Sequence, residues 1–81
     1  MNEIEAEVII ALAENGLRIE RAASILYMHR STVSRHIRNI KRKTGKDPLD
    51  FYDMWWLTAK AKMIAGKYGN FYDDEQGVKN D

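Results

Sequence analysis

Apolar residues recur at intervals of three and four over most of the chain, which is the spacing that gathers side chains on one face of an α-helix. The first such face consists of Ile4, Val8, Ala11 and Leu12. Asn2 and Glu5, three positions apart, have the form of a capping box, and Asn15-Gly16 ends the pattern. We therefore expect a first helix over about residues 3–14.

Two further apolar stripes follow. The second consists of Ile19, Ala22, Ala23 and Leu26, and the third of Val33, Ile37, Ile40 and Thr44. The three residues Tyr27-Met28-His29 separate them, and Gly45 supplies a stop after the third. These stripes predict helices over residues 19–26 and 30–43, with His29 at the N-cap of the latter and Tyr27 as a packing residue.

A fourth helix is predicted over residues 48–65, because Asp47-Pro48 combines an acidic N-cap with proline at the first helical position. It carries two apolar stripes: Leu49, Tyr52, Trp56, Ala59 and Met63 on one side, and Met54, Leu57, Ala61 and Ile64 on the other. No segment alternates as a strand does. We expect an all-α domain of four helices over residues 1–66 and a flexible tail over residues 67–81.

The charged residues are unevenly distributed along the chain. The net charge of +1 over 81 residues is uninformative, but residues 1–17 carry −4, residues 18–46 carry +8 and residues 47–81 carry −3. A concentrated basic segment is the electrostatic signature of a protein that binds a polyanion. The acidic flanks would then limit non-specific affinity for nucleic acid.

Several classes of function find no support in the composition. The chain has no cysteine and two histidines, so we expect neither a metal site nor any other cofactor. The longest apolar run is Val8–Ala13, too short for a membrane span, and the acidic N-terminus is unlike a signal peptide. No catalytic triad, phosphate loop or carboxylate pair can be assembled. We expect a non-enzymatic, cytoplasmic protein with no membrane partner.

The predicted helix 30–43 has a basic face beside its apolar face. Residues 30–43 contain six bases and no acid. At 100° per residue, one contiguous arc is formed by Lys41, Ser34, Arg38, Ser31, Arg42 and Arg35. Arginine pairs with the two acceptors of guanine and serine can bond several base edges, so this arc has the chemistry of a helix in a DNA major groove.

The segment around this helix has the spacing of a helix-turn-helix. It resembles the C-terminal helix-turn-helix of PucR-type transcriptional regulators over roughly residues 12–64. The matching positions are Ala22-Ala23, Leu26-Tyr27-Met28-His29-Arg30, Thr32-Val33, Ile37, Ile40, Thr44-Gly45, Asp47, Asp50, Asp53 and Leu57. The stretch Val33–Ile37 is also similar to the recognition helix of LysR-type regulators, and the whole unit to the helix-turn-helix of Fis.

The resemblance implies sequence-specific binding of double-stranded DNA in bacteria. The family usually has Asn at the position of Ser31 and Tyr-Arg at the position of Arg35-His36, so its target sequence does not transfer to this chain. We assign base reading to Ser31, Ser34, Arg35 and Arg38. We assign phosphate contacts to Arg21, His29, Arg30, Thr32, Lys41 and Arg42, with first-turn capping as the alternative for Thr32.

The two apolar stripes of the fourth helix predict a homodimer, because a domain of this size can hardly cover both. We assign the interface to Met54, Trp55, Trp56, Leu57, Ala61 and Ile64; the alternative is that the first helix and the tail aromatics cover the second stripe. The function predicted is a small bacterial, phage or mobile-element transcriptional regulator. The alternative is an adaptor whose basic face docks an acidic protein without binding DNA.

Overall fold

The computed structural model describes residues 1–66, which form four α-helices and no strand. The helices are α1 (Glu3–Glu14), α2 (Ile19–Leu26), α3 (Arg30–Thr44) and α4 (Phe51–Ile64). The predicted all-α architecture is confirmed. The first three helices have the bounds that the sequence predicts, except that α3 ends one residue later, at Thr44. The predicted tail, residues 67–81, lies outside the described residues.

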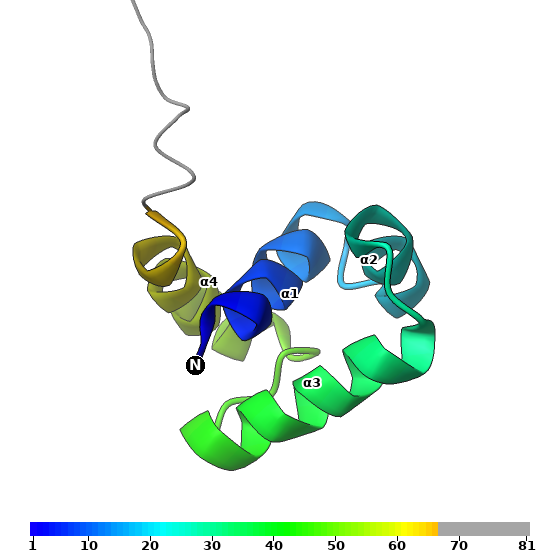
Figure 1. Cartoon of the computed structure of the whole chain (residues 1–81). Helices are drawn as coiled ribbons and strands as arrows, with labels where there is room; N and C mark the ends of the chain where they lie inside the picture. Colours follow the sequence, from blue (N-terminus) through cyan, green and yellow to red (C-terminus); the bar gives the residue numbers. More distant parts are fainter. Residues whose placement is uncertain (67–81) are drawn as a thin grey trace, which may run out of the picture.

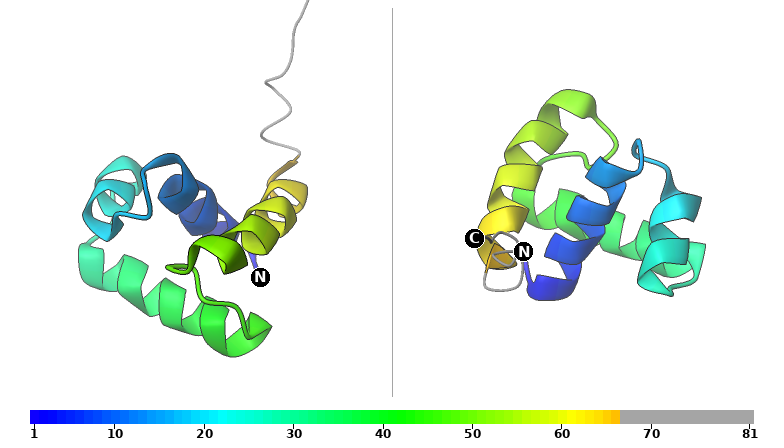
Figure 2. Two further views of the ribbon diagram at one scale, coloured as in Figure 1. Left: turned by 180° about the vertical axis from the view of Figure 1, so that it is seen from behind. Right: turned by 90° about the horizontal axis from the view of Figure 1, so that it is seen from above.

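Helix α1 occupies the middle of the domain (Figure 1). It packs against each of the other three helices, whereas α3 and α4 do not pack against each other within residues 1–66. Seen from above in Figure 2, α4 and α2 lie on either side of α1, with α3 crossing beneath. The fully buried side chains at the centre are Val8, Ile9 and Leu12 of α1, Val33 and Ile40 of α3, and Leu57 of α4.

The two helices of the helix-turn-helix approach closely because small residues face the core. Ala22 and Ala23 of α2 are buried, and the backbone N–H of Met28 donates to the carbonyl of Ala23 at 2.9 Å, which closes the turn. Tyr27 caps α2 in the left-handed conformation, with φ = 56°. Its side chain is 97% exposed, so the expectation that it packs within the domain is wrong: this backbone geometry turns it outward.

The start of α4 also differs from the prediction. Asp47 does not cap the helix; its carboxylate accepts from the N–H of Leu49 at 2.9 Å and forms a turn that contains Pro48. The N-cap is Asp50, whose carboxylate accepts from the N–H of Asp53 at 2.9 Å. Asp53 in turn accepts from the N–H of Asp47 at 2.9 Å. Two acids three residues apart could each cap, and the turn at Pro48 leaves that role to Asp50.

One ion pair joins the first helix to the end of the third. Glu5 completes the predicted capping box with Asn2. The second carboxylate oxygen of Glu5 accepts from Lys43 Nζ at 2.8 Å, although the Glu5 side chain is only 2% exposed. Burial raises the pKa of Glu5, but the bonds from Lys43 and Asn2 and the nearby positive charges outweigh it, so the net pKa is lowered. The carboxylate is therefore ionised where it links α1 to α3.

We predict that Glu5→Gln lowers the free energy of unfolding by about 1–2 kcal/mol at pH 7, because it removes a charged hydrogen bond at a buried position. A lowered pKa in the folded state contributes stability above the ordinary carboxyl value of 4.5, and this contribution is lost as the pH falls through the folded value. Denaturant unfolding at pH 7 and pH 3 should show the difference shrinking in acid. Glu7→Gln, a change at an exposed residue of the same helix, is the control. If Glu5→Gln lowered the free energy of unfolding equally at pH 7 and pH 3, the prediction would be contradicted.

We predict that Tyr27→Gly raises the free energy of unfolding by about 0.5–1 kcal/mol. The left-handed conformation costs roughly 1–2 kcal/mol for a residue with a Cβ atom, partly offset by the greater freedom of glycine in the unfolded chain. The control is Leu17→Gly, also in this region at φ = 62° but packed against the core. That variant should lose stability, since the apolar contact outweighs the strain. Thermal unfolding of both measures the contrast.

Candidate nucleic-acid interface

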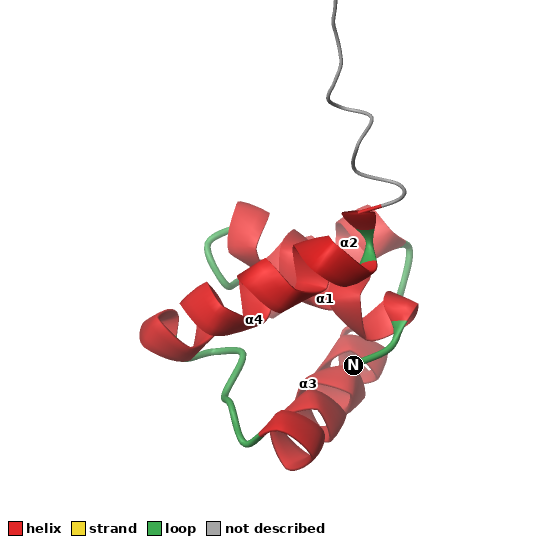
Figure 3. Ribbon diagram, turned by 90° about the vertical axis from the view of Figure 1, so that its left-hand side faces the viewer, coloured by secondary structure: helices red, strands yellow, loops and turns green. Residues whose placement is uncertain are grey.

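The outer side of α3 is open along the length of the helix (Figures 1 and 3). Val33, Ile37 and Ile40 hold the opposite side in the core. Of the predicted base-reading residues, Ser31, Arg35 and Arg38 are exposed, and Ser34 is half-buried at the edge of the same face. The structure therefore brings all four together on one side of the helix.

The guanidinium groups of Arg35 and Arg38 are unusual among the bases of α3. Within residues 1–66 neither makes a hydrogen bond or an ion pair. Most of their neighbours are engaged, as described below. Arg35 and Arg38 therefore present their full set of donors to a ligand, with no intramolecular partner to give up first.

His29 shapes the beginning of this face. As predicted, it is the N-cap of α3: its Nδ1 accepts from the N–H of Ser31 at 3.2 Å and lies 2.9 Å from Ser31 Oγ. This arrangement assigns the ring hydrogen to Nε2, which remains a donor. Thr32 sits in the first turn without capping it, so the capping alternative for Thr32 is wrong because His29 holds that position.

The predicted phosphate-contacting residues differ in how firmly they are held. Arg30 pairs with Glu20 at 3.1 Å and Lys41 with Asp47 at 3.8 Å, both among exposed side chains. Arg42 donates to Asn39 at 2.9 Å, whereas Arg21 has no such partner within residues 1–66. Exposed pairs of this kind contribute about 0–1 kcal/mol, so a stronger anion can displace them.

Lys43, a base of α3 outside the basic arc, is used within the fold. Its ammonium group reaches Glu5, 38 residues away in the sequence. Nothing in the local sequence signals this contact, because it depends on how α1 crosses α3. Glu5 belongs to the acidic N-terminal flank that we expect from the sequence to limit non-specific DNA affinity. The contact shows that it is also a structural partner of α3.

The predicted dimer interface is largely inside the molecule. Met54, Leu57 and Ala61 are buried against α1, and Ile64 packs at the edge of the same core. The three buried residues cannot form a surface for a second chain, so that part of the interface prediction is wrong. The alternative is that the first helix and the tail aromatics cover this stripe. Its first part is confirmed, because α1 packs on the stripe, and the tail aromatics lie outside the described residues.

Trp55 and Trp56, the other two residues of that prediction, point outward from α4. Trp55 is almost fully exposed, and Trp56 is half-covered. The ammonium groups of Lys46 and Lys60 lie 5.5 and 5.4 Å from the centre of the Trp56 ring, within the range of cation–π interactions. Sequence reasoning missed this contact, which links the loop after α3 to α4 at Trp56.

Other kinds of site are not seen in the described part of the chain. Residues 1–66 hold no group of three or more His, Asp or Glu side chains placed to bind a metal ion. None of the four helices has the length and apolar character needed to cross a membrane. The open face of α3 is thus the feature of residues 1–66 with the clearest binding chemistry.

Comparison with known proteins agrees with this geometry. No curated protein and no solved structure shows a significant match to the chain. The family model described as the PucR C-terminal helix-turn-helix domain matches residues 6–62, which include all of α2 and α3 and most of α1 and α4. The chain belongs to the PucR C-terminal helix-turn-helix family.

Proposed function

We propose that the chain is a sequence-specific double-stranded DNA-binding protein that places α3 in the major groove. The observation that carries the proposal is the open face of α3, on which two unpaired arginines and a serine share one arc with no acidic residue. Membership of a helix-turn-helix family supports it, because the second helix of such a unit is the one that enters the groove.

Arg35 and Arg38 are the principal base readers in this proposal. Three residues along a helix span about 4.5 Å, which is comparable to the spacing of about 3.4 Å between base pairs. The two guanidinium groups can thus address neighbouring base pairs, each with the two-pronged geometry that matches O6 and N7 of guanine. Ser31 and Ser34 supply hydroxyl groups on the same side of the helix.

The phosphate contacts come from residues at the margins of this face. Arg21 projects from α2, His29 and Arg30 lie at the start of α3 with Thr32, and Lys41 and Arg42 lie near its end. Such contacts fix the register of the helix but carry no sequence information. The weak pairs of Arg30 and Lys41 would exchange a carboxylate for a phosphate, so binding should leave those side chains neutralised.

The biological role proposed is that of a small transcriptional regulator of a bacterium, phage or mobile element, acting at the nucleoid in the cytoplasm and catalysing no reaction. The second candidate is an adaptor that docks an acidic protein on the same basic face. Both would depend on charge, but only DNA reading requires one base sequence to be preferred over another. Base-sequence preference therefore distinguishes them.

We predict that Arg35→Ala and Arg38→Ala each weaken binding to the preferred DNA site by about 10- to 100-fold, the loss expected for one bidentate base contact. Binding to unrelated DNA should weaken much less. The preferred site can be selected from genomic fragments, and affinities measured by fluorescence anisotropy at two salt concentrations. Lys60→Ala, which removes the same charge from α4, should leave the ratio of specific to non-specific affinity unchanged.

If the wild type shows no preference among sequences, or if Arg35→Ala and Arg38→Ala behave as Lys60→Ala does, base reading by α3 is refuted. Loss of binding to DNA together with retained binding to an acidic protein would favour the adaptor.

We predict a different result for Arg42→Ala. Removing a phosphate contact should weaken binding to all sequences by a similar factor and reduce the slope of log affinity against log salt by about 1. Measurement of that slope for the wild type and the variant tests the role. A change in sequence preference without a change in slope would show that Arg42 contacts a base.

A further inference from the structure

The outer side of α4 carries a large apolar surface that no other part of residues 1–66 covers. Its main members, Phe51, Tyr52, Trp55 and Met63, are each between 73% and 83% exposed. At 100° per residue they share one arc with Ala59 and with the single charged residue Lys62, opposite the buried Met54 and Leu57. A soluble helix is normally apolar on its core side only, so a helix that is apolar on both sides has a second surface to bury.

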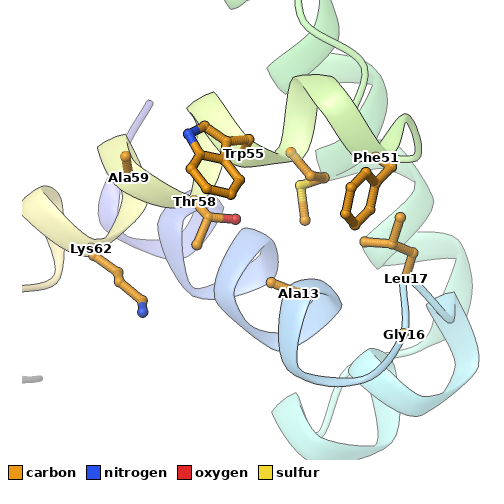
Figure 4. Close-up of a pocket in the computed structure, with 9 residues that line it drawn as sticks. Ala13, Gly16, Leu17, Phe51, Trp55, Thr58, Ala59 and Lys62 are labelled. Atoms are coloured by element: carbon orange, nitrogen blue, oxygen red, sulfur yellow. The ribbon is translucent and has the colours of Figure 1, made fainter.

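This surface contains both a groove and projections. The groove, of about 700 Å³, runs between the end of α1 and α4. Figure 4 shows the rings of Phe51 and Trp55 on the α4 side of the groove, with Ala13 and Leu17 across from them. Tyr52 and Met63 lie farther round α4, beyond Ala59. A surface that carries both shapes can fit a copy of itself across a two-fold axis, as symmetric dimers do.

The charges at the two ends of α4 set the direction of such a pairing. Asp50 is exposed at the N-terminal end, and Lys60 and Lys62 are exposed near the C-terminal end. An antiparallel arrangement brings the acidic N-terminal end of each helix to the lysine-bearing C-terminal end of the other, and it also opposes the helix dipoles. A parallel arrangement would place like charges together at both ends.

The area is sufficient for a modest interface. A buried aromatic side chain contributes about 150–250 Å², so three that are mostly exposed offer on the order of 450 Å² per chain. Met63, Ala59 and Leu17 add to this and bring the surface towards the ~800 Å² per partner of a standard interface. The estimate is at the lower end of what specific protein–protein interfaces bury.

We propose that the outer face of α4, defined here by Phe51, Tyr52, Trp55, Ala59 and Met63, binds a second copy of this chain in an antiparallel, two-fold symmetric dimer. The proposal replaces the interface inferred from the sequence, whose core residues face α1. Because α3 and α4 do not pack together within residues 1–66, dimerisation through α4 leaves the DNA-binding face of α3 free. The dimer would then carry two reading helices, although its existence does not depend on DNA binding.

The oligomeric state of the 81-residue chain tests the proposal by sedimentation equilibrium from 1 to 200 µM. The wild type should associate to a dimer within this range, and Trp55→Glu and Tyr52→Glu should each raise the dimer dissociation constant at least 10-fold. Tyr27→Glu is the matched control, because it introduces the same change at an exposed aromatic residue away from α4, and it should have no effect. Circular dichroism establishes that each variant remains helical.

The direction of pairing is tested with cysteines, since the chain contains none. Tyr52→Cys and Ala59→Cys lie on the same arc, seven residues apart. In the antiparallel dimer, residue 52 of one chain lies near residue 59 of the other, so a mixture of the two variants should form a mixed disulfide under mild oxidation. Efficient cross-linking of either variant to itself, with no mixed product, would show a parallel dimer and overturn the proposed arrangement.

A wild type that stays monomeric to 200 µM, or a dimer that persists in Trp55→Glu and Tyr52→Glu, overturns the proposal. A third outcome is that the full chain is monomeric and that deleting residues 67–81 shifts its tryptophan fluorescence to the red, as exposure of a tryptophan to water does. The C-terminal segment would then cover the outer face of α4, and the second-copy proposal fails. None of these results bears on base reading: a monomeric Trp55→Glu variant that still prefers one half-site would support DNA binding by α3 by itself.

Discussion

The burial of α1 against the other three helices is the constraint on which the rest of this domain depends. Val8, Ile9 and Leu12 are fully buried, and they form the surface on which the helix-turn-helix and α4 are placed. A small domain buries only about 60% of the surface its unfolded chain exposes, so one central helix that serves three partners is an economical arrangement. It fixes the position of α3 without using the outer side of that helix.

The same arrangement divides the basic residues into two groups. Lys43 is directed to Glu5 of α1 and helps to hold α3 in place. Arg35 and Arg38 lie on the exposed side of α3 and make no hydrogen bond or ion pair within residues 1–66. Charged groups thus have two roles on α3. The buried carboxylate of Glu5 helps to position the helix through Lys43, and the unpaired guanidinium groups remain available to bind a ligand. A count of charges along the chain cannot separate these roles.

Helix α4 presents a different balance. One side completes the core through Met54, Leu57 and Ala61, and the other exposes aromatic residues to solvent. Exposed aromatic surface of this extent is unfavourable for an isolated domain and favourable for association, because its burial releases water from apolar groups. Trp56, flanked by Lys46 and Lys60, stands apart from that surface. It ties α4 to the loop that follows α3.

The elements with local signals were determined by the sequence alone. The apolar stripes, the capping box of Asn2 and Glu5, the cap at His29 and the stop at Gly45 predicted α1, α2 and α3 almost to the residue, because each signal acts within one or two helical turns. The basic arc of α3 followed in the same way from helical periodicity. The start of α4 was less determined, since Asp47 and Asp50 could both cap and the turn at Pro48 assigns the role.

Only the tertiary structure decided which surfaces are covered. Both stripes of α4 are apolar, and periodicity cannot tell which one α1 will bury. The pattern alone therefore places the core residues Met54, Leu57 and Ala61 in an interface. The outward position of Tyr27 depends on a left-handed backbone conformation. The sequence gives no signal of it, because the residue is not a glycine. The pairing of Lys43 with Glu5 requires two helices to cross. Each of these outcomes is set by contacts between segments distant in the chain, for which a local pattern carries no information.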